Sequence, residues 1–490
     1  MDLLIQIDRS SPTPLVEQIE RGVRMAIETG QVEPGARLPS TREFARQLGV
    51  TRFTVDDAYS RLVGEGYLEG RHGSGTYVAE HVRMAPETVP HAQATGPARR
   101  SLSQWAQRLA SLPVPPQPDP GLEFTFLAGS PALDKLPLTV WQRLIAREAR
   151  NQETTGFSYG ETAGMSSLRE VIAAYAARSR GVSCTADQVV ITSGVQQSMD
   201  LLMRLVIDPG STVVVEDPGY EDVRTTALLA GATVRPVPVD GEGLRVDLLP
   251  APSRAIRLVC ITPSHQYPTG AILPLARRLE LLRWAQATGA LIMEDDYDSE
   301  LRYDSRPVPA LAALAMAGNG PNNVIYLGSF SKVLFPALRL GYAILPPDLV
   351  PPFVHAKRAV ERHAPALTQA AVATFIAEGH FERHLAKMRR VYSSRHDALL
   401  AALDRHLPGI AHRDASMRSA GLHVLTRFDV GMTEDQLVHL AASHGIGLEG
   451  AARCYINPPA TPHLVMGYSS MSEDRIDEGI KCLAHAIRRS

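Results

Sequence analysis

A proline-rich stretch divides this chain into two parts of unequal size. Residues 81–120 contain eight of the 36 prolines and show few helix or strand patterns. Proline at this density favours an extended, semi-rigid linker. We therefore expect a small domain over 10–80, a linker over 81–120, and a large domain over 121–490 with a smaller subdomain from about 355. Within the linker, residues 101–112 have the spacing of a short helix that lies on a neighbouring domain.

Composition and charge narrow the class of protein. Apolar residues make up 44% and charged residues 21% of the 490 residues, an ordinary soluble composition. The four cysteines form neither a CxxC pair nor a disulfide spacing. Residues 1–10 lack the layout of a signal peptide, and no run of 18 apolar residues occurs. We expect a protein of the reducing cytoplasm without a membrane partner.

The small part has the pattern of three helices followed by a hairpin. A first apolar series at helical spacing stops at Gly30. Residues 40–43 form a capping box that opens a second helix, which ends at Gly49. Thr51 is placed to cap a third helix, and the glycine-rich residues 70–75 join two short strands. The pattern predicts a helix-turn-helix with a wing.

Exposed side chains of this unit are candidates for DNA contacts. A helix N-terminus favours a phosphate, and the outer side of the third helix can reach the edges of bases. The candidates are Ser40, Thr41, Arg42, Arg52, Thr54, Asp57 and Arg61 on the helices and Arg71, His72 and Gly73 in the wing. The alternative is a helical cap or a dimerisation module, because residues 1–80 hold nine arginines against twelve acidic residues, a net charge of −3.

A family resemblance favours the DNA-binding alternative. The run Pro34-Gly35-Ala36-Arg37-Leu38-Pro39-Ser40-Thr41-Arg42-Glu43 and the wing sequence up to Val78 closely resemble the winged-helix domain of GntR-type bacterial regulators. The resemblance extends over essentially all of residues 10–80. It implies an α+β winged helix-turn-helix that binds double-stranded operator DNA.

In the large part, apolar β-branched runs alternate with helical patterns. Such runs are buried on both faces and indicate a mostly parallel sheet covered by helices, an α/β fold. The runs are residues 189–192, 212–215, 258–261, 291–293 and 324–327. Ligands of such sheets bind beyond the carboxyl ends of the strands. The residues that follow each run are therefore the candidates for a binding site.

Those residues offer four kinds of chemistry. Ser193-Gly194-Val195-Gln196 opens a helix whose N–H groups could hold a phosphate, and Tyr220 adds an aromatic ring. Residues 294–298 are a cluster of acids around Tyr297, for which a solvated or helix-capping group is the alternative. Lys332, one of only five lysines beside 45 arginines, follows the last strand, where burial could lower its pKa and make the amine a nucleophile. Together these groups match the needs of pyridoxal 5′-phosphate.

Residues 120–490 resemble the aspartate-aminotransferase-like fold, type I of the pyridoxal-phosphate enzymes. The resemblance implies that Lys332 carries the internal aldimine, that Asp295 rather than Asp296 pairs with the pyridine nitrogen, and that Tyr297 hydrogen-bonds the ring hydroxyl. It also implies that Tyr220 stacks on the ring. The phosphate ligands that it implies are Gly194, Val195, Gln196, Ser329 and Arg339.

A winged helix joined by a linker to this fold is the arrangement of the MocR/GabR family of transcriptional regulators, which the whole chain resembles. Tyr267 stands where aminotransferases usually have asparagine, and residues 464–469 lack the arginine that many of them use for a substrate carboxylate. Arg453 and Arg224 are the candidates for an anionic effector group. The resemblance implies a homodimer that senses an amino compound or pyridoxal phosphate, and the alternative is a working aminotransferase with an attached DNA-binding domain. No metal is expected.

Overall fold

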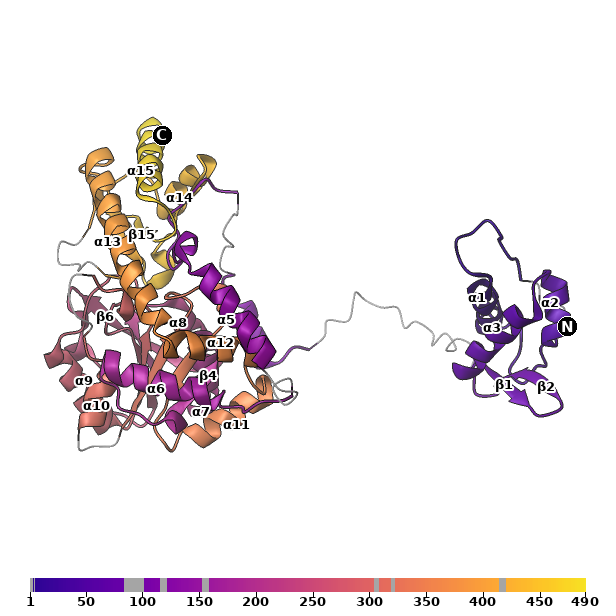
Figure 1. Cartoon of the computed structure of the whole chain (residues 1–490). Coiled ribbons are helices and arrows are strands. Elements are labelled where there is room, and N and C mark those ends of the chain that lie inside the picture. Colours follow the sequence, from indigo (N-terminus) through magenta and orange to yellow (C-terminus); the bar gives the residue numbers. More distant parts are fainter. Residues whose placement is uncertain are drawn as a thin grey trace. The chain divides into compact units, whose positions relative to one another are not determined.

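The computed structural model describes residues 3, 5–82, 101–114, 121–151, 158–303, 308–318, 322–413 and 420–490. The chain forms two compact units, Met1–Ser101 and Leu102–Ser490, which are described separately (Figure 1). Most of the predicted linker, residues 83–100 and 115–120, lies outside the described residues.

The first unit consists of three helices and a two-stranded antiparallel sheet. Its elements are α1 (Leu15–Glu28), α2 (Thr41–Leu48), α3 (Arg52–Gly64), β1 (Leu68–Arg71) and β2 (Gly75–Val78). Ser40 Oγ accepts a hydrogen bond from the Glu43 N–H at 3.2 Å, and Gly49 ends α2 at a φ of 64°. The predicted helices, the caps at Ser40 and Gly49 and the hairpin are therefore confirmed. Of the two hydrogen bonds of the predicted capping box, the structure shows the one to the Ser40 hydroxyl.

An eight-stranded sheet forms the centre of the second unit. The strand order is β4-β11-β10-β9-β8-β5-β6-β7, and the five strands from β10 to β6 run parallel. The strands are β4 (Val189–Thr192), β5 (Thr212–Asp217), β6 (Thr233–Asp240), β7 (Gly243–Leu244), β8 (Ile256–Ile261), β9 (Leu291–Asp296), β10 (Val324–Ser329) and β11 (Gly341–Ile344). All five predicted strands are present.

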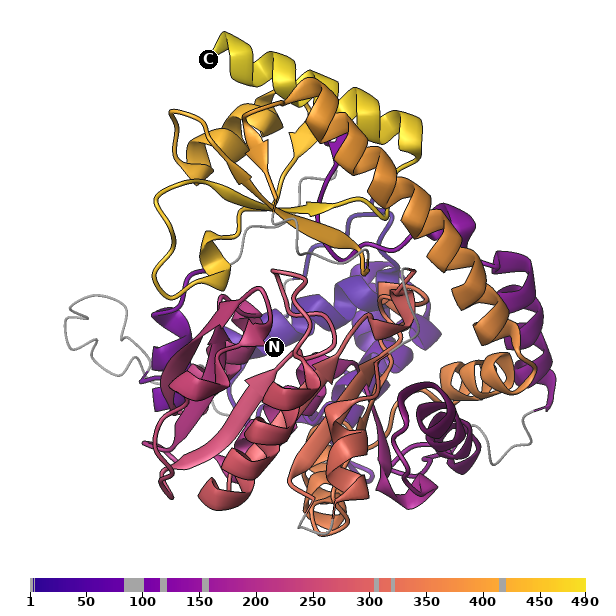
Figure 2. The ribbon, with the colours of Figure 1, turned by 90° about the vertical axis from the view of Figure 1, so that its left-hand side faces the viewer.

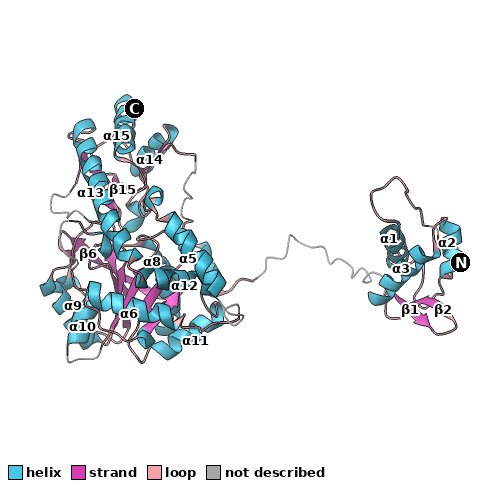
Figure 3. Ribbon diagram, in the orientation of Figure 1, coloured by secondary structure: helices cyan, strands magenta, loops and turns pink. Residues whose placement is uncertain are grey.

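Helices cover both faces of this sheet, as Figures 2 and 3 show. They are α5 (Leu138–Asn151), α6 (Ser166–Arg180), α7 (Val195–Val206), α8 (Glu221–Leu229), α9 (Leu275–Thr288), α10 (Leu311–Ala317), α11 (Val350–Val360) and α12 (Ala366–Ala377). Successive side chains of a strand point to opposite faces. Val213 and Val215 therefore pack with Phe353 of α11 in one core, whereas Val214 packs in the other with Leu281 of α9.

A smaller layer lies at one end of the sheet. A three-stranded antiparallel sheet of β12 (Ala411–His412), β13 (His423–Phe428) and β15 (His463–Gly467) is accompanied by α13 (His380–His406), α14 (Glu434–Ser443) and α15 (Glu473–Arg489). β14 (Ile446–Gly447) pairs in parallel with β3 (Phe124–Thr125), so the start of this unit lies beside its end. Short 3₁₀ turns occupy Leu133–Lys135, Ala186–Gln188, Val246–Leu248, Ser299–Leu301, Pro336–Leu338 and Ala452–Cys454.

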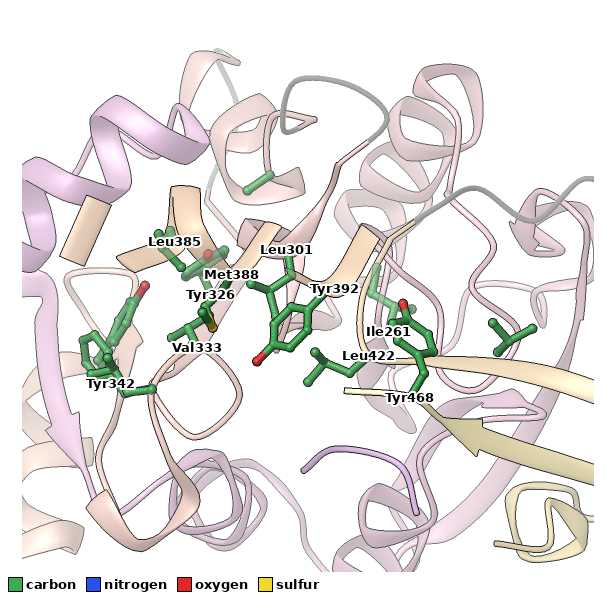
Figure 4. Packing of buried hydrophobic residues seen from close by; sticks show 14 of the residues in the cluster. Ile261, Leu301, Tyr326, Val333, Tyr342, Leu385, Met388, Tyr392, Leu422 and Tyr468 are labelled. Atoms are coloured by element: carbon green, nitrogen blue, oxygen red, sulfur yellow. The ribbon is translucent and has the colours of Figure 1, made fainter. Parts of the chain in front are cut away.

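One apolar core joins the large sheet to the smaller layer. Figure 4 shows Tyr326 and Tyr342 of the sheet, Leu385, Met388 and Tyr392 of α13, and Leu422 and Tyr468 near the small sheet in the same cluster. This shared core fixes the loops between the two layers, where the candidate site lies.

The short helix predicted in the linker is present as α4 (Gln104–Ala110), which lies on the second unit. Arg108 Nε donates a hydrogen bond to the Leu229 carbonyl at the end of α8, at 3.1 Å. Among the helices of the described ranges, none is both long and apolar enough to cross a membrane.

Candidate functional site

Lys332 lies three residues beyond β10, at the carboxyl edge of the large sheet. Its Nζ donates a hydrogen bond to the Gly129 carbonyl at 3.0 Å. Gly129 has a φ of 81°, and a Cβ at this position would collide with Lys332 Nζ. Burial lowers the pKa of Lys332, although the nearby carboxylates Glu449, Asp298 and Asp295 oppose this shift. A lowered pKa makes the amine easier to deprotonate, as a nucleophilic lysine requires.

Asp295 and Asp296 face opposite sides at the end of β9. Asp296 Oδ2 accepts hydrogen bonds from Arg180 Nε and from the Tyr326 hydroxyl, both at 2.7 Å. Asp295 instead lines a cavity beside Tyr220 and Thr262, and its Oδ1 has no hydrogen-bond partner. Burial, followed by the charges of Asp296 and Asp298, raises the pKa of Asp295 to about 7. A protonated ring nitrogen would satisfy this buried oxygen, so the residue fits the proposed cofactor.

Aromatic rings surround the same edge. The Tyr220 ring lies edge-on to Tyr267, with centroids 5.8 Å apart, and Tyr267 lies 6.2 Å from Tyr297 in the same geometry. Tyr220 donates its hydroxyl hydrogen to Asp222 at 2.6 Å, and Tyr267 donates to Glu449 Oε1 at 3.1 Å. The hydroxyl of Tyr267, at the position of the missing asparagine, is therefore already used within the protein.

The start of α7 and Arg339 form a cradle for an anion. Gly194 caps α7 at a φ of 108°, and a Cβ there would lie 3.7 Å from the Arg339 guanidinium. The free N–H groups of the first turn carry partial positive charge. Ser329 ends β10, and its Oγ accepts from the Ser331 N–H at 3.1 Å. Gln196 Nε2 donates to Thr226 of α8 at 3.1 Å, so its side-chain amide is engaged within the protein.

The two arginines expected to meet an anionic effector have partners inside the protein, and of the two Arg224 lines the cavity. Arg224 donates to the carbonyls of Tyr455 and Arg453 at 2.9 and 2.8 Å. Arg453 pairs with Glu449 and lies 3.5 Å from Glu221. Binding of an effector by either side chain would compete with these contacts.

The site also contains residues that the sequence patterns did not single out. Glu216 lines the cavity, and burial raises its pKa to about 7 although Thr262 Oγ1 donates to it at 2.7 Å. His265 Nδ1 lies 2.9 Å from Asp298 Oδ2. His265 lies in the loop that resembles the aminotransferase Asn-Pro-Thr-Gly segment, and Asp298 belongs to the acid cluster. Because both residues are neighbours of predicted site residues in the sequence, this proximity could have identified them as candidates.

In the first unit, half of the predicted DNA contacts gather where α2 and α3 begin. Arg52 Nε donates to Thr41 Oγ1 at 3.3 Å, which brings the two helix starts together beside the exposed Arg42 and the cap Ser40. Thr54 lies one turn into α3, where its hydroxyl contacts Thr51 Oγ1 at 2.8 Å. Side chains at this position can reach both a phosphate and a base edge.

The remaining predicted contacts lie elsewhere. Arg61 pairs with Asp57 at 3.1 Å at the far end of α3, and Arg71 pairs with Glu69 and Glu80 at 2.6 and 3.1 Å. His72 and Gly73 are exposed in the turn of the wing, where Gly73 has a φ of 74°. Phe53, which the sequence patterns did not indicate, projects from the first turn of α3 with 79% of its surface exposed.

Comparison with known proteins covers both units. Residues 15–78 match the gntR family of bacterial regulatory proteins, and residues 126–446 match aminotransferase class I and II. The probable rhizopine catabolism regulatory protein MocR of Rhizobium meliloti is 36% identical over 99% of this chain and 96% of its own. The pyridoxine biosynthesis transcriptional regulator PdxR of Corynebacterium glutamicum is 32% identical over 97% of this chain and 96% of its own.

Among solved structures, the α-aminoadipate aminotransferase LysN of Thermus thermophilus, complexed with a phosphopyridoxyl amino acid, has a TM-score of 0.69. It is 29% identical and covers 79% of this chain and 95% of its own. The second unit therefore has the type I fold of pyridoxal-phosphate enzymes. The relatives include regulators that match over nearly the whole chain. The chain combines a GntR-type DNA-binding unit with an aminotransferase-like unit that binds pyridoxal phosphate. It therefore belongs to the MocR/GabR family of transcriptional regulators.

Proposed function

We propose that the aminotransferase-like unit is a sensor that holds pyridoxal phosphate at Lys332 and responds to an amino compound or to the cofactor itself. The observation that carries this proposal is the position of Lys332 beside a buried carboxylate, Asp295, whose Oδ1 has no partner. Burial lowers the pKa of the lysine, and the orphaned oxygen matches a protonated ring nitrogen.

Each remaining site residue has a role under this proposal. Tyr220 stacks on the cofactor ring, and Tyr297 hydrogen-bonds the ring oxygen. Gly194, Val195, Gln196, Ser329 and Arg339 hold the phosphate, with Gln196 contributing its backbone N–H because its side chain is directed to Thr226. The bound cofactor supplies an aldehyde carbon that a primary amine can attack. An effector amine would compete with the Lys332 amine and free its side chain to change its contact with Gly129.

The pocket favours sensing over turnover. In the region where many aminotransferases bind the substrate carboxylate, Leu464, Val465 and Met466 of β15 are fully buried apolar residues. The two candidate arginines, Arg224 and Arg453, are engaged by backbone carbonyls and by Glu449, respectively. A working aminotransferase is the second candidate, because LysN has the same fold and the site retains Lys332 and Asp295.

Residues 10–80 are proposed to bind operator DNA through Ser40, Thr41, Arg42, Arg52, Thr54, Arg61, Arg71, His72 and Gly73, and residues 121–490 to form the sensor. A regulator that binds operator DNA works in the cytoplasm. We propose a homodimer, since two winged helices would read two half-sites.

Visible absorbance of the purified protein with pyridoxal phosphate tests the proposal. Lys332→Ala should abolish the absorbance of the lysine-bound cofactor, whereas Lys481→Ala, a lysine of α15, should retain it. Incubation with amino donors and 2-oxo acids should give no sustained turnover. Unchanged absorbance in Lys332→Ala would refute the assigned anchor, and multiple turnovers at an ordinary enzymic rate would replace the sensor with the aminotransferase.

A further inference from the structure

The His265 side chain lies between Tyr297 and Asp298, close to the predicted position of the cofactor. Its Nδ1 is 2.9 Å from Asp298 Oδ2 and 3.0 Å from the Tyr297 hydroxyl oxygen. His265 and Asp298 are 3% and 1% exposed, so water does not replace these contacts. One ring nitrogen therefore serves two oxygen partners.

Two glycines hold the imidazole in this orientation. A Cβ on Gly421 would collide with Cε1 of His265, and a Cβ on Gly270 would lie 3.2 Å from its Nε2. Both glycines have a positive φ, 74° and 76°, which other residues rarely adopt. The ring packs closely against these two backbone positions, and the hydrogen bond to Asp298 orients Nδ1 toward the two oxygens.

The contacts determine where the hydrogen atoms lie. A carboxylate only accepts hydrogen bonds, so the Nδ1 atom that faces Asp298 carries a hydrogen. A protonated Nδ1 cannot accept from Tyr297, and the Tyr297 oxygen can only accept from it. The hydroxyl hydrogen of Tyr297 is consequently left to point at a different acceptor.

We propose that His265, fixed by Asp298, is a positioning residue that directs the hydroxyl hydrogen of Tyr297 to the ring oxygen of pyridoxal phosphate. The inference rests on the proposed role of Tyr297 at that oxygen. It also accounts for the replacement of asparagine by Tyr267, whose hydroxyl is bound to Glu449 at 3.1 Å and does not serve the ring oxygen. With that donor absent, the direction of the Tyr297 hydrogen decides how well the ionised ring oxygen is stabilised.

Titratable groups pack around His265 from several elements. Besides Asp298 and Tyr297, these are His423 of β13, Tyr267 of the same loop and His396 of α13. Burial lowers the pKa of His423 to about 3 and lowers that of His396. Burial raises the pKa of both Tyr297 and Tyr267. Asp295, whose pKa burial raises to about 7, lies at the same sheet edge. The test therefore compares variants that all retain Asp295, and only the difference between their midpoints is attributed to His265.

Two amide variants separate the positioning role from a merely structural one. Asparagine can place an amide N–H near the position of Nδ1, whereas glutamine places it near Nε2. The measured quantity is the midpoint pH, at which the change in visible absorbance of the bound cofactor is half complete. We expect His265→Asn to have the same midpoint as the wild type. His265→Gln should raise the midpoint by about one pH unit, because the ionised ring oxygen loses a directed hydrogen bond. In a Tyr297→Phe background, His265→Gln should cause no further shift.

Equal midpoints in the asparagine and glutamine variants, or a shift that persists without the Tyr297 hydroxyl, would overturn the inference. Should the glutamine variant not fold, Asp298→Leu tests the same logic. Leucine removes the acceptor that keeps the hydrogen on Nδ1, so Nδ1 can accept the hydroxyl hydrogen of Tyr297 and the midpoint should again rise. An unchanged value would count against the inference. Absence of visible absorbance in the wild type would instead refute the proposed cofactor site itself.

Discussion

Replacing Asp295 with asparagine should weaken cofactor binding while stabilising the protein without cofactor. In the folded protein burial raises the pKa of this carboxyl from 3.8 to about 7. The unfolded chain therefore ionises first, and folding stability falls as pH rises from about 4 to about 7. At about 1.4 kcal/mol per pH unit, the carboxylate costs up to about 4 kcal/mol at pH 8. Asparagine removes this cost.

The same substitution removes the partner of the ring nitrogen. A hydrogen bond between charged groups contributes about 1.5–3 kcal/mol, so the dissociation constant for pyridoxal phosphate should rise by roughly 10- to 150-fold. Asp296→Asn is the matched control. It breaks a buried pair with Arg180 and should destabilise the protein by about 3–5 kcal/mol.

Urea unfolding of the cofactor-free proteins at pH 5 and pH 8, together with equilibrium dialysis of pyridoxal phosphate, measures both effects. The stability gain of Asp295→Asn should be present at pH 8 and shrink at pH 5. A variant that is less stable than wild type at pH 8, or that binds the cofactor with unchanged affinity, would refute the reasoning.

Three further substitutions test other parts of the account. Gly129→Ala should reduce the yield of lysine-bound cofactor by absorbance, because its Cβ would collide with Lys332 Nζ; wild-type occupancy would contradict the fixed position of this amine. Arg52→Ala should weaken binding of an operator, selected from random DNA, by about tenfold in a gel-shift assay and leave cofactor absorbance intact; an unaltered affinity would count against α3 as the reading helix. Phe53→Ala removes an exposed ring and should change the preferred bases in that selection. Its free energy of unfolding, measured by thermal unfolding, should stay within about 0.5 kcal/mol of the wild-type value.

Local patterns predicted the elements of the first unit and part of those of the second, in which strands such as β6 and β11 were not predicted. The cap at Ser40, the left-handed Gly49 and the glycine-rich wing are short-range signals, and the structure reproduces them. The five predicted strands also formed, because a run of buried β-branched residues is recognisable without knowledge of its neighbours. Alternation along β9 predicted that Asp295 and Asp296 face opposite sides, and their different partners agree with it.

Contacts between distant segments could not be predicted in this way. Lys332 meets the carbonyl of Gly129 across 203 residues, and Tyr267 meets Glu449 across 182. The partnership of His265 with Asp298 depends on how two loops pack at the sheet edge. The internal partners of Arg224 could likewise not be predicted from the sequence, because its hydrogen bonds go to backbone carbonyls, which every residue has.

The most direct test of the central claim is the affinity for a selected operator, measured with and without pyridoxal phosphate and a panel of amino compounds. The account predicts that at least one of these ligands changes the affinity of the wild type. It predicts that Lys332→Ala still binds the operator but no longer responds. A response of the same size in Lys332→Ala, or no response in the wild type to any of them, would contradict a sensor built around this lysine.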